Sequence, residues 1–430
     1  MMMIDGTYHE HSGWVTLMLG AVYFGAYQVL RKQGKSDKLL EIHYLLAAIT
    51  LLIIATGLQF KQYDLVAAWS IQAAILLWCG VRWRLRFVIS TGLVLYGLVF
   101  FQLLVCRTFP TYDYTSYYHF IFNERSFGMW AIILSLFGAS IVIQRFEESS
   151  FKDIVKYGLT YGWIAVLFAW LTVETNDYFG MYINYNNAVE VWTRTHYYLE
   201  MAFGFVWGSY GLLLLVGARW RKNIMIIHAS IIVSLIAFFG VGINSLMYKP
   251  IMDFVLVNNI RAGLLLYTIM IFAMQLNLIR RYPSAQRVIV QAFGVGILLL
   301  IFELITVETF SYYEHKIIAF RNQTGANYYD SNYMIALNNT RQLMLSVVWL
   351  VYSILMMVIG FWRKNRGLRI ASIVLSGIVI LKVFIFDLHF LTMLNRIISF
   401  FGLGVILLLT SYIYQRYKHV LLADELKNDE

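Results

Sequence analysis

The chain has 430 residues, of which 60% are hydrophobic and only 13% are charged. A soluble protein would carry roughly a quarter charged residues, so the composition excludes that class. The net charge of +10 does not indicate nucleic-acid binding, because the basic residues lie in short segments between apolar runs, as cytoplasmic membrane loops do.

Apolar runs of about 18–22 residues recur along the whole chain, each long enough to cross a hydrocarbon core of ~30 Å. Backbone groups in lipid must be satisfied within each segment, which favours helices. We therefore predict an all-α, polytopic transmembrane helical bundle with about thirteen spans. In chain order they cover residues 13–30, 40–59, 64–81, 87–105, 126–144, 154–173, 198–217, 224–243, 260–279, 287–307, 341–361, 369–387 and 396–414.

The loops between these spans alternate in charge. One set, which includes residues 31–38, 82–86 and 363–369, is rich in Lys and Arg, whereas the other set holds most of the acids. The excess of Lys and Arg predicts that the first set is cytoplasmic. With an odd number of spans, the N-terminus is then outside and the C-terminus is cytoplasmic.

A unit of about 135 residues repeats after the first span. The sequence Thr-Val-Glu-Thr ends the sixth predicted span at residues 172–175 and the tenth at residues 306–309. Each unit has four spans, and this even number predicts parallel repeats around an axis along the membrane normal. The predicted division is a lone span with its loop at 1–39, repeats at 40–146, 147–282 and 283–417, and a cytoplasmic tail at 418–430.

The fourth span of each repeat begins with Asn and Arg. These residues are Asn123 and Arg125, Asn259 and Arg261, and Asn395 and Arg396. Arginine at an outer end runs against the positive-inside bias. Two interpretations stay open: the arginines pair with an acid from the repeat, such as Glu174 or Glu308, or they snorkel to lipid headgroups.

Three outer segments, 106–125, 174–197 and 308–340, are rich in tyrosine and long enough to fold over the membrane as loops. Aromatic rings can stack on the apolar faces of sugars and carboxylates can bind their hydroxyls, although a membrane interface also collects Tyr and Trp. The candidate substrate-binding residues are Glu174, Asp177, Arg194, His196, Glu308, His315 and Arg396.

Three ionisable residues lie deeper, within predicted spans: Glu303, Lys382 and Asp387. Charges in spans usually face protein or water and have a function. A structural link between Lys382 and Asp387, or snorkelling to the interface, is the equally open alternative.

Neither a phosphate-binding glycine loop nor a Ser-His-Asp arrangement can be identified. The string of His9, Glu10 and His11 lacks the helical spacing of a zinc site. We therefore predict no metal and no cofactor, and we name no catalytic residue.

Several segments resemble a bacterial family of predicted membrane proteins, domain-of-unknown-function family 2339. They are Lys382-Val383-Phe384-Ile385-Phe386-Asp387-Leu388, Asn395-Arg396-Ile397-Ile398-Ser399-Phe400-Phe401-Gly402-Leu403-Gly404, Ser411-Tyr412-Ile413-Tyr414-Gln415-Arg416-Tyr417, Ala68-Trp69-Ser70-Ile71-Gln72 and Leu77-Trp78-Cys79-Gly80-Val81-Arg82. The resemblance implies a multi-pass protein of the bacterial inner membrane, and this chain is similar to a compact member. Many relatives are longer, and Glu often stands where this chain has Gln72. The family supplies no catalytic residues.

Three functions follow as hypotheses. The first is a non-enzymatic protein that binds or moves a lipid-linked or saccharide-like envelope substrate at the extracytoplasmic side. The second is a glycosyl or acyl transferase that uses outer carboxylates and histidines. The third is a scaffold subunit with membrane-protein partners in an envelope complex.

Overall fold

The structure is a computed structural model. It describes residues 5–33, 38–105, 119–145, 150–185, 189–221, 223–247, 254–281, 287–324 and 332–386, with short stretches at 397, 401–402, 404–405, 408 and 411–412. Over these residues it is helical, without a strand. The helices are α1 (Asp5–Gln33), α2 (Lys38–Gln59), α3 (Gln62–Trp83), α4 (Arg86–Val105), α5 (Glu124–Val142) with the 3-10 turn η1 (Ile143–Arg145), α6 (Ser150–Tyr185), α7 (Val189–Arg221), α8 (Ile224–Met247), α9 (Ile260–Arg280), α10 (Arg287–Thr324), α11 (Asn332–Trp362) and α12 (Arg366–Ile385).

Within the described ranges, 12 helices are long and apolar enough to cross a membrane. They match the first twelve predicted spans in order, which confirms the all-α polytopic membrane fold. The thirteenth predicted span, 396–414, falls largely outside the described residues. The chain is therefore a multi-pass membrane protein.

Five of the described helices, α1, α6, α7, α10 and α11, run well past their predicted spans. α6 has 36 residues and α10 has 38. A helix of that length measures ~54–57 Å, which exceeds a hydrocarbon core of ~30 Å. The prediction that 174–197 and 308–340 are loops was wrong, since helix covers 174–185, 189–197, 308–324 and 332–340. Polar composition suggested loops, but residues 308–324 contain neither proline nor glycine, so nothing in this segment interrupts the helix.

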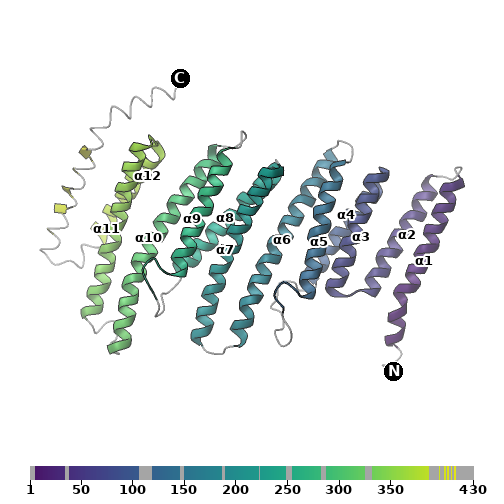
Figure 1. Cartoon of the computed structure of the whole chain (residues 1–430), viewed down its shortest axis with the longest axis horizontal. Helices are drawn as coiled ribbons and strands as arrows, with labels where there is room; N and C mark the ends of the chain where they lie inside the picture. Colours follow the sequence, from purple (N-terminus) through teal and green to yellow (C-terminus); the bar gives the residue numbers. More distant parts are fainter. Residues whose placement is uncertain are drawn as a thin grey trace, which may run out of the picture. The chain divides into compact units, whose positions relative to one another are not determined.

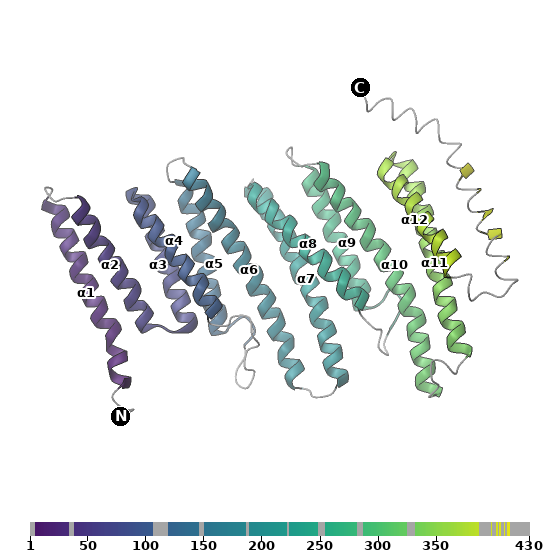
Figure 2. The ribbon, with the colours of Figure 1, turned by 180° about the vertical axis from the view of Figure 1, so that it is seen from behind.

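The chain divides into two compact units, Met1–Val241 with Met274–Pro283, and Gly242–Ala273 with Ser284–Glu430. In the first unit, α1 packs along α2, α3 packs against α4 and α5, and α6 packs against α5 and α7 (Figure 1). Figure 2 shows the same helices from behind. The core of this unit lies among α3, α4, α5 and α6, where Leu77, Ile89 and Ile132 are fully buried.

In the second unit, α11 packs against both α10 and α12. Serine residues lie at the contact between α11 and α12, where the hydroxyl of Ser376 donates to that of Ser353 at 3.1 Å. Small residues of this kind let membrane helices approach closely without a hydrophobic driving force.

A tryptophan–threonine hydrogen bond recurs at matching places. The indole N–H donates to the threonine hydroxyl in the pairs Trp69–Thr56, Trp207–Thr172 and Trp349–Thr306, at 3.0, 2.9 and 2.9 Å. Three residues after the second and third tryptophans, the hydroxyls of Tyr210 and Tyr352 donate to backbone carbonyls at 2.9 and 2.8 Å. These contacts support the repeat, while its domain boundaries stay a prediction.

The helix pairs α3–α4 and α11–α12 are joined by tight turns of one design. Arg84 and Lys364 take left-handed backbone angles, with φ of 58° and 51°. Gly80 and Gly360 each accept a backbone hydrogen bond of 2.9 Å from the residue five positions later. A Cβ atom on Gly80 would lie 2.8 Å from the backbone nitrogen of Ile89, so glycine permits this close approach.

Candidate functional site

The first polar cluster begins where α5 begins. Asn123 is the N-cap residue, and its side-chain oxygen accepts from the backbone N–H of Ser126 at 2.8 Å. The same side chain donates through its nitrogen to the carbonyl of His119 and to both carboxylate oxygens of Glu174. The asparagine therefore starts the helix and also fixes the carboxylate of the neighbouring helix α6.

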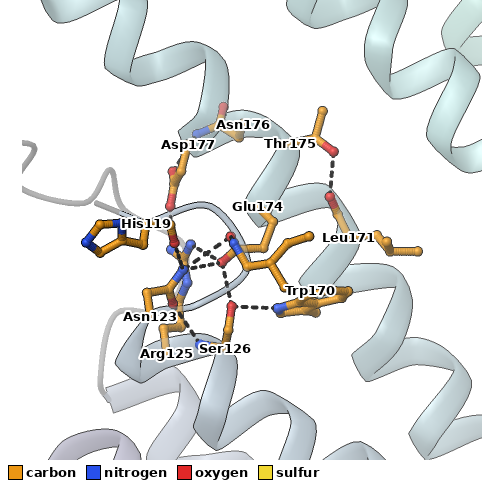
Figure 3. Close-up of polar contacts among 11 residues, drawn as sticks. His119, Asn123, Arg125, Ser126, Trp170, Leu171, Glu174, Thr175, Asn176 and Asp177 are labelled. Carbon is orange, nitrogen blue, oxygen red and sulfur yellow. Dashed lines mark hydrogen bonds and ion pairs between the residues drawn. The ribbon is translucent and has the colours of Figure 1, made fainter. Parts of the chain in front are cut away.

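Glu174 lies at the centre of this cluster (Figure 3). Its carboxylate accepts from Arg125 Nη2 at 2.8 Å, from the Ser126 hydroxyl at 2.9 Å and from the backbone N–H of Ile121 at 3.1 Å. The Trp170 indole in turn donates to the Ser126 hydroxyl at 2.9 Å. The carboxylate is therefore fixed by donors from α5 and from the segment before it, and Trp170 of α6 holds one of these donors in place.

A second carboxylate meets the other side of the guanidinium. Arg125 Nη1 lies 2.5 Å from an oxygen of Asp177, one turn after Glu174 on α6. The side chains of Arg125, Glu174 and Asp177 are only 1–3% exposed. The cluster places one positive and two negative formal charges in a dry environment, where ion pairs need additional hydrogen bonds to offset their lost hydration.

The second polar cluster repeats this arrangement between α9 and α10. The Glu308 carboxylate accepts from the Asn259 side chain at 3.0 Å, from Arg261 Nη2 at 3.1 Å and from the backbone N–H of Val257 at 2.8 Å. Asn259 again caps its helix, accepting from the N–H of Ala262 at 2.9 Å. Arginine and carboxylate are again almost fully buried.

The two clusters differ in charge. Where the first has Asp177, the second has Ser311, whose hydroxyl accepts from Arg261 at 2.7 Å. Arg261 also donates to the carbonyl of Val307 at 3.1 Å. The second cluster therefore holds one formal charge of each sign.

Each cluster includes a strained backbone position. Ile121 and Val257 have φ of 69° and 64°, a region that β-branched residues rarely adopt. Each directs its N–H at the carboxylate of its cluster, Glu174 or Glu308. Backbone strain of this kind costs ~1–3 kcal/mol and persists only where surrounding contacts hold it.

These contacts confirm one of the two interpretations of the outer arginines. Arg125 and Arg261 pair with Glu174 and Glu308 across neighbouring helices. Because both carboxylates accept several hydrogen bonds and are shielded from water, they are poorly placed to transfer protons or attack a substrate. The first and second polar clusters join the last helix of one predicted repeat to the first helix of the next.

The remaining candidate residues are not part of either cluster. His196 lies 3.5 Å from Glu200, one turn along α7, and is half exposed. The His315 ring lies 5.9 Å from that of Phe254. The side chain of Arg194 and residues Arg396 and Asp387 lie outside the described part of the structure.

Glu303 is a carboxylate inside a span. It lies on α10 and accepts a hydrogen bond from the hydroxyl of buried Ser245 on α8. Among the residues that the structure describes, no Lys, Arg or His forms an ion pair with it, although the positive charge of Arg261 on α9 is close enough to act on it. A Cβ atom at Gly242 would lie 3.3 Å from its carboxylate, so glycine permits the close approach of this group to α8. Three residues before Thr172, the matching position in α6 is Ala169, so the repeat does not account for Glu303.

Lys382 on α12 bonds to the facing helix. Its ammonium donates to the carbonyl of Gln342 at 2.7 Å and to the hydroxyl of Ser346 at 2.6 Å. It also lies 5.9 Å from the ring centre of Trp349. These contacts attach α12 to α11, whereas the predicted link to Asp387 is untested.

Sequence reasoning missed the neutral members of the sites, chiefly Ser126, Trp170, Ser245 and Ser311. A serine within an apolar run carries no distinctive signal in a single sequence. The only available hint was spacing, because Ser311 follows Glu308 as Asp177 follows Glu174. Among the described residues, no group of three or more His, Cys, Asp and Glu is placed to hold a metal ion.

A family model described as "Predicted membrane protein (DUF2339)" matches residues 3–417. Comparison with curated proteins finds no match, and neither does comparison with solved structures.

Proposed function

The chain belongs to this DUF2339 family, and we propose that it binds or moves a lipid-linked or saccharide-like substrate at the extracytoplasmic side of the bacterial inner membrane. In this proposal the N-terminus is outside and the C-terminus is cytoplasmic. The basic residues at the ends of α1 and α3 support this orientation, because Lys and Arg collect in cytoplasmic loops.

The observation that carries the proposal is the carboxylate of Glu303. An ionisable group inside a span is costly and marks a substrate or ion pathway by default. This one is only half buried, is bound by the hydroxyl of Ser245 and lies beside Gly242. A carboxylate that binds a hydroxyl in the protein has the chemistry to bind the hydroxyl of a sugar.

Two features of α10 support a saccharide-like ligand. Beyond Glu303 the helix continues to Thr324, and this part carries the adjacent rings of Tyr312 and Tyr313, 5.2 Å apart. Further along, the His315 ring meets that of Phe254. Aromatic rings can stack on the apolar faces of sugars, and their place past the hydrophobic part of α10 suits a ligand at the membrane surface.

The clusters argue against the transferase alternative. Glu174 and Glu308 are held by arginine and buried hydrogen bonds, whereas a general acid or base must reach the proton that it transfers. The same clusters are compatible with a scaffold subunit. A scaffold would retain a protein partner, whereas a ligand-binding protein would retain a small molecule.

The test is identification of what the purified protein retains. The full chain is expressed in a bacterial host, purified in mild detergent and examined by native mass spectrometry, with lipid extraction to identify bound molecules. We expect a retained lipid-linked or saccharide-bearing molecule in the wild type, and at least a tenfold loss in Glu303→Gln. Asp64→Asn is the matched control, because Asp64 is an exposed carboxylate at the start of α3.

Two outcomes would overturn the proposal. One is wild-type protein without such a molecule, and the other is equal retention by wild type and Glu303→Gln. Stoichiometric recovery of one membrane-protein partner with both variants, and of no small ligand, would replace it with the scaffold function.

A further inference from the structure

A polar cavity lies in the first unit, at the opposite end of α5 from the first polar cluster and on the side of the basic loops. Its volume is about 280 Å³, and it is enclosed by the end of α5, the beginning of α6 and the first residues of α8. The polar side chains in its wall are Ser140, Gln144, Lys156, Thr160 and Asn223, and Trp163 lies beside them. None of these residues belongs to the polar clusters or to the surroundings of Glu303.

The beginning of α8 makes this cavity suitable for an anion. Residues 224–226 form part of the wall, and the first N–H groups of a helix have no partner within the helix. Asn223 accepts from the N–H of Met225 at 3.0 Å and leaves others available. α8 has 24 residues, so its N-terminus carries a substantial partial positive charge.

Thr160 supplies a second, independent observation that favours a ligand in this cavity. Thr160 is only 4% exposed, and its side chain lines the cavity. Thr172 and Thr175 on the same helix each donate to the carbonyl four residues earlier. Thr160, by contrast, makes no such hydrogen bond within the described ranges, and its side chain faces the cavity, where a ligand can bind to the hydroxyl.

The charge in the wall is positive. Among the described residues, Lys156 is the only charged one that lines the cavity, and it lies half buried on α6 with Lys152 one turn earlier. By contrast, the cavity among α1–α4 is lined by apolar residues such as Leu17, Ala48 and Leu52. The polar lining is therefore particular to the α5–α6–α8 cavity and is not general to the spaces between these helices.

We propose that the α5–α6–α8 cavity binds a phosphate group, with Lys156, the Thr160 hydroxyl and the N-terminal amides of α8 as its contacts. A basic pocket between spans at the membrane surface is the kind of site that binds the headgroups of anionic lipids. Free phosphate has the same chemistry and is the second source. The site is independent of the substrate proposed for Glu303.

The test uses the delipidated full chain with two probes. Native mass spectrometry measures binding of phosphatidylglycerol against phosphatidylcholine, and thermal unfolding in sodium phosphate against sodium chloride measures binding of the free ion. We expect Lys156→Gln to weaken binding about fivefold and Thr160→Val to weaken it about threefold. Lys152→Gln is the control, because Lys152 does not line the cavity.

Each result decides between the sources or overturns the proposal. Selective binding of phosphatidylglycerol alone identifies a lipid headgroup, and stabilisation by phosphate identifies the free ion. Wild-type protein that prefers neither probe overturns the proposal, as does equal binding by wild type, Lys156→Gln and Thr160→Val. If Lys156→Gln fails to fold, Thr160→Val still tests the proposal, because valine has nearly the shape of threonine.

Discussion

The first polar cluster gives the sharpest test of how the helices are held together. Arg125→Met removes the cation that pairs with both Glu174 and Asp177, whose side chains are only 2–3% exposed. Removing one partner of a buried ion pair costs ~3–5 kcal/mol, because the other charge is left uncompensated. With two carboxylates left behind, we expect a loss of ~5 kcal/mol in the free energy of unfolding.

The second cluster supplies an internal comparison. Arg261→Met leaves only one carboxylate, Glu308, which retains donors from Asn259 and Val257. We expect a smaller loss, ~3 kcal/mol. Arg145→Met is the matched control, since Arg145 lies in η1, directly after the opposite end of α5, and is exposed. It should change stability by less than ~0.5 kcal/mol.

The assay is reversible unfolding in mixed micelles, followed by tryptophan fluorescence. A triple variant that replaces Arg125, Glu174 and Asp177 with Met, Leu and Leu should recover most of the loss, because apolar side chains of similar volume can replace a buried ionic group. The reasoning is refuted if Arg125→Met is no more destabilising than Arg145→Met. It is also refuted if Arg261→Met costs more than Arg125→Met.

Three further predictions use the same unfolding assay. Trp349→Phe deletes the hydrogen bond to Thr306 and should cost ~1 kcal/mol; an unchanged stability would contradict a structural role for the bond. Gly80→Ala should cost ~1–3 kcal/mol, because its methyl group would overlap the start of α4, whereas Gly97→Ala has open space and should not destabilise. Val257→Asn should stabilise by ~1 kcal/mol, because asparagine tolerates the left-handed backbone angle; a loss of stability would show that the position is not strained.

Much of the fold follows from local patterns in the sequence. Apolar runs of spanning length determine helices, because lipid offers no other partner to the backbone, and twelve of the predicted spans match helices in order. The limits of the helices do not follow from hydropathy. α6 and α10 continue beyond their apolar parts, because a helix ends where its backbone is interrupted and polar residues do not interrupt it.

The site shows the same division. The repeat drew attention to Arg125 and Arg261, because arginine is unusual at the predicted outer end of a span. It also offered Glu174 and Glu308 as possible partners. An arginine that pairs with an acid and one that snorkels to lipid headgroups look the same in a single sequence. Only the packing of neighbouring helices could therefore decide between the two interpretations. Neutral partners such as Ser245 become visible only when a second helix brings a carboxylate to them.

Local sequence is enough to identify the chain as a helical membrane protein, because the length and apolarity of each segment are properties of that segment alone. Only the tertiary structure showed that the repeated carboxylates are already bound by arginine, that Glu303 has a hydroxyl for its partner, and that Lys156 and Thr160 line one cavity. Contacts of this kind join residues from different helices, and their register depends on how the helices pack.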